Sequence, residues 1–257
     1  MRILTIGDVV GTLGVEYLQH HLRRFITENK IDTAFVNAEN ASPGNGLTSA
    51  CADMIFDAGA DIITSGNHIW QKHDIYAYMD THSNIIRPCN YPGSNPGMGY
   101  TNRNINGYRI LAINVMGTVF TTPLDNPFEC VEKILSRESG NYDIATLDIH
   151  AETTSEKLAL GRYFDGRINV IYGTHTHIPT ADLQILPNGS GYITDLGMTG
   201  AHNGVLGVKT DNIIYKFKTN MPVRFEPADD DVRCDGAIFE LDCNGRCVGT
   251  KQIFALE

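Results

Sequence analysis

Two histidines one residue apart, His175 and His177, lie in the stretch GTHTH directly after an apolar run at residues 168–172. The apolar run is typical of a buried strand, and a polar loop leaving such a strand is where α/β proteins usually hold their chemistry. Neutral imidazole is the commonest side-chain ligand of transition metals. A single H-x-H pattern is weak, since an ordinary polar loop with two unrelated histidines also fits it. The pair therefore indicates a metal site only if other strands end in further ligands.

Polar side chains follow four other predicted strands, at residues 3–6, 33–36, 61–64 and 142–149. These side chains are Asp8, Glu39, Asn40, Asn67, His68 and His150. Because the carboxyl ends of parallel strands form the binding edge of an open α/β sheet, we expect them to lie close together. Helix capping explains part of the pattern, since Asp and Asn are good N-caps, but Glu39 is not of a capping type.

Together with His175 and His177, these residues supply two carboxylates, two amides and three imidazoles, and His68 is an additional fourth imidazole. This set exceeds the needs of one four-coordinate zinc ion and suits two adjacent divalent ions that share a carboxylate. Nitrogen and oxygen ligands without thiolate favour Fe, Mn, Zn or Co. Two such ions with Asp8 and Glu39 leave a positive centre that attracts phosphate and acidifies bound water. His68, next to a ligand, is placed to protonate a leaving oxygen, so the pattern predicts phosphate-ester cleavage.

The elements that must position these residues follow a repeated pattern in the first ninety residues. Predicted strands at 3–6, 33–36 and 61–64 alternate with predicted helices at 15–26, 48–56 and 72–79, and a short strand at 84–87 follows. Such βαβ units predict a parallel sheet with right-handed crossovers. A turn-rich segment at 88–107 then interrupts the pattern and could form a loop over the site.

The second half begins with a strand at 109–115, a helix at 127–135 and the strand at 142–149. Thr153 and Glu156 form a capping-box pattern that predicts a helix continuing through Gly161. After residue 180 we expect no helix, only short strands at 183–185, 191–194, 212–219, 223–226, 237–241 and 248–254. Their spacing favours antiparallel pairing. The chain is therefore predicted to be one α/β domain, residues 1–257, with a mixed or antiparallel sheet in its second half.

Composition narrows the class of protein. The 257 residues carry a net charge of −10, which argues against stable nucleic-acid binding because phosphate backbones attract positive surfaces. The amino terminus is read as a strand without the features of a signal peptide, and no apolar run approaches the roughly 20 residues that span a bilayer. We therefore expect a cytoplasmic protein without membrane partners, whose six cysteines are reduced thiols.

Several stretches together resemble a known family. Asp8, the turn GNH at 66–68, His150 and GTHTH at 173–177 are similar to the ordered motifs of the calcineurin-like metallophosphoesterases. The stretches GDVVG at 7–11, NAEN at 37–40, GNHIW at 66–70, HAETTSEK at 150–157 and DLGMTG at 195–200 resemble the YmdB-like bacterial branch. The resemblance covers essentially the whole chain. It implies a single metallophosphoesterase domain with a four-layer αββα sandwich of two mixed sheets flanked by helices.

The resemblance also implies a di-metal phosphodiesterase with 2′,3′-cyclic nucleotides and cAMP as substrate classes. Its two divalent or mixed-valence ions would be iron first, with manganese, zinc or magnesium as alternatives. In this assignment a bridging hydroxide attacks phosphorus and His68 is the general acid. The ligands of metal one would be Asp8, Glu39, Asn40 and His177. The ligands of metal two would be Glu39, Asn67, His150 and His175.

Two features depart from the broad superfamily, and two other functions stay open. Val9 and Val10 follow Asp8 where the superfamily usually has Asp-x-His, and Glu39 replaces the usual bridging Asp. A regulatory protein that binds a nucleotide or phosphorylated partner and turns it over slowly would use the same residues. An amidohydrolase also uses H-x-H, but at the end of its first strand, whereas here the pair comes late. The partners we expect are a small cyclic nucleotide or other phosphodiester and, as an oligomer, a homodimer or homotetramer.

Overall fold

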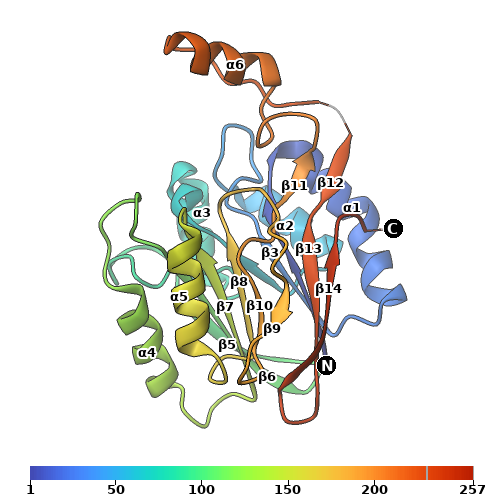
Figure 1. The fold of residues 1–257 in the computed structure, drawn as a ribbon, viewed down its shortest axis with the longest axis vertical. Coiled ribbons are helices and arrows are strands. Elements are labelled where there is room, and N and C mark those ends of the chain that lie inside the picture. The colour runs from blue at the N-terminus through green and yellow to red at the C-terminus, as the bar shows by residue number, and fades with distance from the viewer. Residues whose placement is uncertain (230, 257) are drawn as a thin grey trace.

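The computed structural model describes residues 1–229 and 231–256 and has two β-sheets packed face to face, with helices on both outer faces (Figure 1). The first sheet has the strand order β14-β13-β1-β3-β4. Its strands are β1 (Arg2–Ile6), β3 (Thr33–Asn37), β4 (Ile62–Thr64), β13 (Gly236–Leu241) and β14 (Cys247–Ile253). Strands β1, β3 and β4 are parallel, as the repeated βαβ pattern predicts, and β13 joins β1 antiparallel.

The second sheet has the order β5-β6-β7-β8-β10-β9. Its strands are β5 (Tyr100–Ile105), β6 (Tyr108–Met116), β7 (Ile144–His150), β8 (Val170–Thr174), β9 (Gln184–Ile185) and β10 (Gly191–Ile193). The four inner strands are parallel and both edge strands are antiparallel, so this sheet is mixed. The predicted four-layer αββα sandwich is confirmed.

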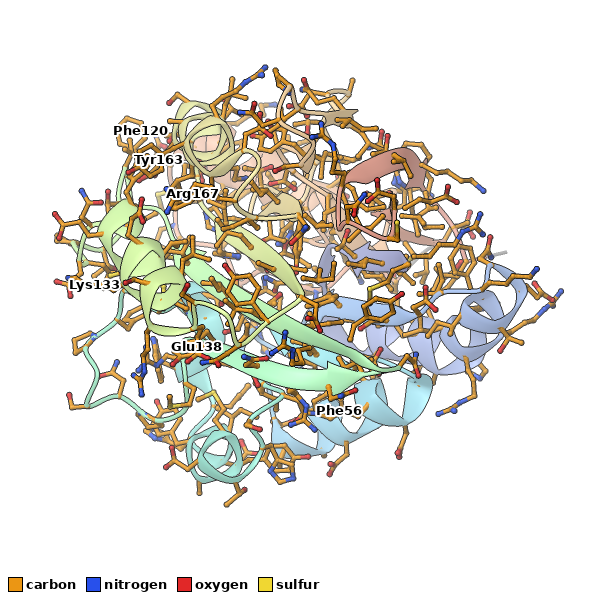
Figure 2. All side chains as sticks on the ribbon, turned by 90° about the horizontal axis from the view of Figure 1, so that it is seen from below. Phe56, Phe120, Lys133, Glu138, Tyr163 and Arg167 are labelled. Carbon is orange, nitrogen blue, oxygen red and sulfur yellow. The ribbon has the colours of Figure 1, made fainter. Side chains whose placement is uncertain are left out.

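Helices cover the outer face of each sheet, and side chains fill the space between the layers (Figure 2). On the first sheet lie α1 (Gly11–Glu28), α2 (Ser49–Ala58) and α3 (Asp74–Thr81), and a 3₁₀ turn, η1 (Asn67–Gln71), precedes α3. On the second lie α4 (Pro127–Arg137) and α5 (Thr154–Phe164). The two sheets meet over a third apolar cluster that includes Ile3, Phe35, Tyr172 and Phe239. Within the described part of the chain, no helix is both long and apolar enough to cross a membrane.

A small third sheet, in the order β12-β11-β2, lies beside the ends of β1 and β3. It consists of β2 (Asp8–Val9), β11 (Met198–Ala201) and β12 (Val232–Cys234). Gly7 is required where the chain passes from β1 to β2, because a Cβ there would lie 2.2 Å from the carbonyl oxygen of Gly197. This close approach holds Asp8 at the sheet edge, where the backbone N–H of Asp8 donates to Gly197.

One prediction for the last third of the chain is wrong. Residues 212–219 form no strand but most of a helix, α6 (Thr210–Thr219), and residues 223–226 have no strand partner. The β-formers Ile213, Ile214, Tyr215 and Phe217 suggested a strand, but of these only Ile213 is buried. With no sheet edge beside it, the segment satisfies its backbone internally as a helix that ends at left-handed Asn220.

Two smaller predictions also fail, and a third is confirmed for its helix, α5, but not for its cap. Residues 84–87 make isolated bridges instead of a strand, and the turn-rich segment 88–107 contains edge strand β5. Thr153 starts α5, but its side chain caps no backbone N–H, so the capping box does not form. Glu156 instead accepts hydrogen bonds from the backbone of Thr118 and Val119. The long-range contact outcompetes the local one because it satisfies a loop that has few other partners.

Candidate metal centre

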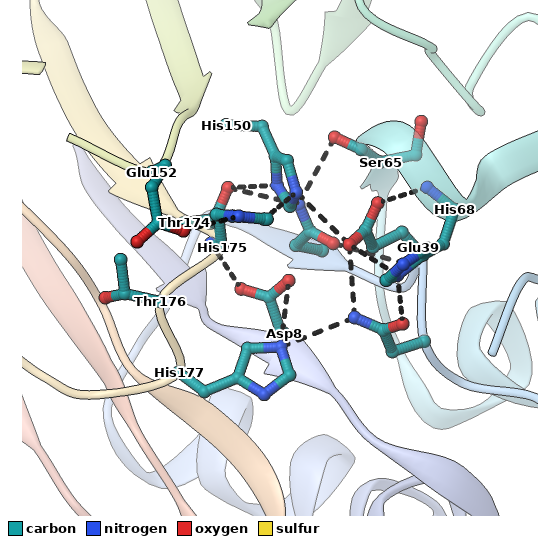
Figure 3. A network of polar contacts seen from close by, with 12 residues as sticks. Asp8, Glu39, Ser65, His68, His150, Glu152, Thr174, His175, Thr176 and His177 are labelled. Carbon is teal, nitrogen blue, oxygen red and sulfur yellow. Dashed lines mark hydrogen bonds and ion pairs between the residues drawn. The ribbon is translucent and has the colours of Figure 1, made fainter. Parts of the chain in front are cut away.

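The polar side chains singled out from the sequence converge where strand ends of both sheets meet (Figure 3). Asp8 lies in β2, and Glu39 and Asn40 follow β3. The 3₁₀ turn after β4 begins with Asn67 and His68, His150 ends β7, and His175 and His177 follow β8. The common edge thus brings together residues as far apart in sequence as Asp8 and His177.

Glu39, His150 and His175 form the tightest group, with one ligand atom from each lying within 4.8 Å of the others. The Nε2 atom of His150 is 3.1 Å from Glu39 Oε1 and 3.0 Å from His175 Nδ1. Glu39 and His150 are fully buried. His175 is 21% exposed, so the group is open to solvent on one side, and a carboxylate and two imidazoles that converge in this way could hold a transition-metal cation.

Asp8 and His177 lie next to each other, and His177 is also close to Asn40. The buried Asp8 Oδ1 atom has no hydrogen-bond partner and is 3.7 Å from His177 Nε2. The Nδ2 atom of Asn40 lies 3.4 Å from His177 Nε2 and 3.1 Å from Glu39 Oε1, whereas its Oδ1 faces His68. A ligand role for Asn40 therefore needs its amide turned by 180°, which would present the oxygen to the cluster.

Asn67 lies between Gly66, which packs closely against Glu39, and His68, whose backbone N–H donates to Glu39. Its buried Oδ1 atom, like that of Asp8, lacks a hydrogen-bond partner. The preceding Gly66 has no room for a side chain, because a Cβ would lie 2.3 Å from His150 Nε2 and 2.5 Å from Glu39 Oε2. Two buried oxygens without hydrogen-bond partners, at strand ends that also carry imidazoles and a carboxylate, are costly in a protein alone. The residues present therefore fit metal cations.

The loop that carries the two histidines has a strained backbone. His175 and His177 have φ angles of 101° and 63°, in the left-handed region that side chains rarely adopt. Two carboxylates hold this conformation. Asp8 Oδ2 accepts the His175 N–H at 3.0 Å, and Asp195 Oδ2 accepts both the N–H and the hydroxyl of Thr176, at 3.1 and 2.8 Å. Asp195 is in turn paired with buried Lys157, whose Nζ lies 2.6 Å away.

A second polar network lies behind His150, in the space between the two sheets. Thr174 Oγ1 is 2.9 Å from His150 Nδ1 and donates to Asp148 Oδ1 at 2.7 Å. Because Thr174 uses its proton on Asp148, it accepts one from His150, which leaves His150 Nε2 free to bind a cation. Asn37 and Thr64 of the first sheet also donate to Asp148. Burial, opposed by His150, raises the pKa of Asp148 to about 6.

Sequence reasoning assigned no role to several of these residues. Glu152 Oε2 is 3.1 Å from His175 Nε2 and so orients the ring with Nδ1 toward His150. Glu152 lies within the stretch HAETTSEK at 150–157, yet no spacing rule identifies its partner. Asp148 carried a readable signal, since it is a charged residue inside the apolar run of β7. Thr174 and Asn37 carried none, because hydroxyl and amide side chains commonly end strands.

Burial and neighbouring charged groups shift the pKa values of the clustered side chains. Burial alone would raise the pKa of Glu39, but the neighbouring His150 and His68 hold the pKa of Glu39 well below its usual range. Burial would lower the pKa of His150, yet Glu39 beside it raises that pKa to about 9. Burial and the charge of His150 lower the pKa of His175. A cation binding here must displace protons from imidazole, so metal binding and proton release are linked.

His68 is oriented but not enclosed. Its backbone N–H donates to Glu39 Oε2 at 2.9 Å, and its Nδ1 lies 2.8 Å from Asn40 Oδ1. The side chain remains 28% exposed and borders a cleft that opens beside the centre. With Nδ1 occupied by the Asn40 amide, Nε2 is the nitrogen left to exchange a proton with a ligand in that cleft.

Two comparisons with known sequences cover most of the chain. A profile of YmdB-like proteins matches residues 4–253. A 2′,3′-cyclic-nucleotide 2′-phosphodiesterase of Bacillus subtilis (strain 168) is 43% identical over 242 residues, which are 94% of this chain and 92% of that protein.

Solved structures are similar to the whole chain. A structure described as a novel phosphatase from Mycoplasma pneumoniae superposes with a TM-score of 0.93 and 34% identity, covering 99% of this chain and 92% of that one. A 5′-nucleotidase precursor from Thermus thermophilus has a TM-score of 0.61 at 11% identity and covers 99% of this chain and 54% of that one. The second likeness shows the fold alone.

Proposed function

The chain belongs to the YmdB-like protein family, and on this premise we propose that it is a metal-dependent phosphodiesterase acting on 2′,3′-cyclic nucleotides, with cAMP as a second substrate class. One observation carries the proposal: Glu39, His150 and His175 converge, and the buried oxygens Asp8 Oδ1 and Asn67 Oδ1 of the neighbouring strand ends have no hydrogen-bond partner. Such a donor set suits two divalent cations, with iron foremost, and a phosphate ester beside them.

The donors divide into two sets that share Glu39. Two bound ions would offset the charge of the phosphate and acidify the attacking water. The first set is Asp8, Glu39, Asn40 and His177. The second set is Glu39, Asn67, His150 and His175. Glu152 and Thr174 fix the two imidazoles of the second set with the correct nitrogen inward.

His68 supplies the proton that the leaving oxygen needs. As the water oxygen forms its bond to phosphorus, the bond from phosphorus to one ribose oxygen breaks and that oxygen accepts a proton from His68 Nε2. Asn40 lies 2.8 Å from Nδ1 of this ring, and with its amide turned to bind a cation its Nδ2 would donate to Nδ1, so that Nε2 carries the proton on the substrate side. A positioned general acid contributes roughly 10²- to 10⁴-fold to turnover.

The test measures hydrolysis of bis(p-nitrophenyl) phosphate and of 2′,3′-cyclic nucleotides by protein supplied with Mn²⁺ or Fe²⁺. Asp8→Ala and Asn67→Ala should lose both bound metal and activity. His68→Ala should keep its metal content and lose roughly 10²- to 10⁴-fold in kcat. His73→Ala is the matched control, because this nearby histidine packs against the ring of Tyr76.

Two results would contradict the proposal. Activity unchanged in Asp8→Ala or Asn67→Ala would separate catalysis from the donor set, and loss of metal in His68→Ala would make His68 a ligand. Tight binding of cyclic nucleotides without turnover by the metal-loaded protein would instead favour a regulatory nucleotide-binding protein.

A further inference from the structure

A cleft of about 540 Å³ opens directly beside the proposed phosphate site. His68, His177 and Asn40 border it at the metal centre, and the far wall belongs to the segment 201–229. The size lies in the range of small-molecule sites, which is roughly 300–1,000 Å³. A substrate whose phosphate lies at the centre would therefore extend the rest of its structure into this cleft.

The far wall is made by a part of the chain that projects from the sandwich. The segment includes α6, which lies apart from both large sheets at one end of the molecule (Figure 1). Within the segment, the chain before α6 is joined to the chain after it by backbone hydrogen bonds from Lys209 to Glu226 and from Ala228 to Gly207. Leu206 has a φ angle of 53° and is 44% exposed although it borders the cleft.

The cleft is mostly apolar and includes one exposed aromatic side chain. Val10, Leu13, Leu206 and Val208 contribute aliphatic surface. Phe225 also lines the cleft and is 51% exposed. A phenylalanine kept half in water costs free energy unless a partner covers it. A flat aromatic ligand stacking on the ring would provide that partner.

The charges of the cleft exclude a second phosphate. Among its described lining residues none is lysine or arginine, and Glu226 and Asp229 add carboxylates. Lys209 pairs with both carboxylates, at 3.6 and 3.4 Å, and is not itself part of the lining. A groove for a nucleic-acid strand needs cations along its path. The cleft instead suits a neutral ring.

We propose that this cleft binds the nucleobase of a single cyclic nucleotide, and that Phe225 is a specificity-determining residue on which the base stacks. The inference rests on the proposed function, because the phosphate site fixes the end from which the base extends. The inference explains how the protein would distinguish between phosphodiesters. The phosphate would bind at the centre, and the apolar wall of the cleft would favour esters that carry a base.

The test compares adenosine 2′,3′-cyclic phosphate with the 2′,3′-cyclic phosphate of methyl riboside, which has the same reacting ring and no base. Phe225→Ala should raise KM for the nucleotide by roughly tenfold and leave the base-free ester unchanged. Phe225→Trp should restore the nucleotide KM because it keeps an aromatic face. Phe217→Ala is the control, since Phe217 is 77% exposed on α6 and is not among the cleft residues.

Equal KM changes for both esters, or no change for the nucleotide, would overturn the inference. Calorimetric binding of adenosine 3′-phosphate and methyl riboside 3-phosphate to the metal-loaded protein gives a readout without turnover. If wild-type protein cleaves neither ester, the proposed function fails. The binding experiment still decides the inference, which is supported by a preference for the nucleotide that Phe225→Ala removes and is overturned by equal affinities.

Discussion

The residues of the centre are held in place by carboxylates that accept backbone hydrogen bonds. His175 and His177 adopt left-handed backbone conformations, which cost roughly 1–3 kcal/mol each. Asp8 and Asp195 offset this cost by accepting backbone N–H groups of the loop. The strain directs His175 toward Glu39 and His150 and His177 toward Asp8. A regular strand would have placed both rings on one face of the sheet.

The contact between Thr174 and His150 leads to a prediction at this scale. Thr174→Val keeps the shape of the side chain but removes the oxygen 2.9 Å from His150 Nδ1. The ring then loses the partner that fixes its tautomer, so metal affinity should fall by roughly 10- to 100-fold. Titration with Mn²⁺ in competition with a chelator measures the affinity.

Thr64→Val is the matched control for this change. Thr64 donates to the same carboxylate, Asp148, at 2.5 Å, and has no hydrogen bond to His150. It should lower stability without lowering metal affinity. Equal losses of affinity in the two variants would show that the hydroxyls support the core and do not position the ring.

At the scale of elements, α5 and the histidine loop are joined by a buried ion pair. Lys157 and Asp195 are 0% and 1% exposed, and a Cβ on Gly173 would lie 2.7 Å from Lys157 Cδ. Lys157→Met should therefore destabilise the protein by about 3–5 kcal/mol, because Asp195 would remain buried and unpaired. Urea unfolding of the metal-free protein measures this loss.

Lys133→Met provides the comparison for Lys157→Met. Lys133 is 75% exposed on α4 and forms a loose pair with Glu129. Its substitution should change the free energy of unfolding by less than about 1 kcal/mol. Adding Asp195→Asn to Lys157→Met should recover part of the stability. If Lys157→Met alone costs no more than Lys133→Met, the buried pair does not hold the loop.

Helices α4 and α5 are linked on the outside by Glu132, Tyr163 and Arg167, the last two of which lie together in Figure 2. Hydrogen bonds from Arg167, and then from Tyr163, lower the pKa of Glu132 from 4.5 to about 2. Because the folded pKa is the lower one, the pair stabilises the protein above pH 4.5 and loses this effect as pH falls toward 2.

Glu132→Gln should thus lower stability by at most about 1 kcal/mol at pH 7, since the pair is partly exposed and screened by solvent. The difference from wild type should shrink as pH falls below 4.5 and should also shrink in high salt. Denaturant midpoints at several pH values measure it. A difference that is constant with pH would assign the effect to packing instead of charge.

The elements also show where sequence patterns succeed. Strands β1, β3 and β4 could be predicted because buried parallel strands are continuous apolar runs between helical segments. The α6 segment could not, because its β-branched and aromatic residues favour a strand and only the absence of a neighbouring edge makes it a helix. The strand predicted at residues 84–87 is absent for a related reason. A short apolar stretch does not show how many residues will pair with a neighbouring strand.

For the whole molecule, the convergence of these side chains could be predicted from the sequence, but the hydrogen bonds that support them could not. Polar residues after parallel strands must meet at one edge, so Asp8, Glu39 and Asn67 were readable from spacing. The second sheet adds His150 and His175 only because it packs face to face with the first. Contacts such as Thr174 to Asp148 depend on the distance between sheets, which no local pattern encodes.

Because the proposed donors come from both sheets, bound metal should stabilise the entire fold. In the proposed ligand assignment, ions held by Asp8 and Glu39 beside one sheet and by His150 and His175 of the other bind only when the sheets are packed. Folding is then stabilised by about 2.7 kcal/mol when free metal is 100 times its Kd. For a chain of this size that corresponds to a rise in Tm of roughly 5–10 °C. Scanning calorimetry of chelator-treated protein titrated with Mn²⁺ measures the rise.

Asp8→Ala separates binding at the centre from ions bound elsewhere. The variant lacks the carboxylate of the first set, which also accepts the His175 N–H that positions the second set, but it keeps the surface charges, so its Tm should respond only weakly to Mn²⁺. The wild-type Tm should keep rising with the logarithm of metal concentration above Kd, because metal binds the folded state and not the dispersed ligands. A wild-type Tm that is independent of Mn²⁺ would mean that the strand ends form a purely polar junction between the sheets.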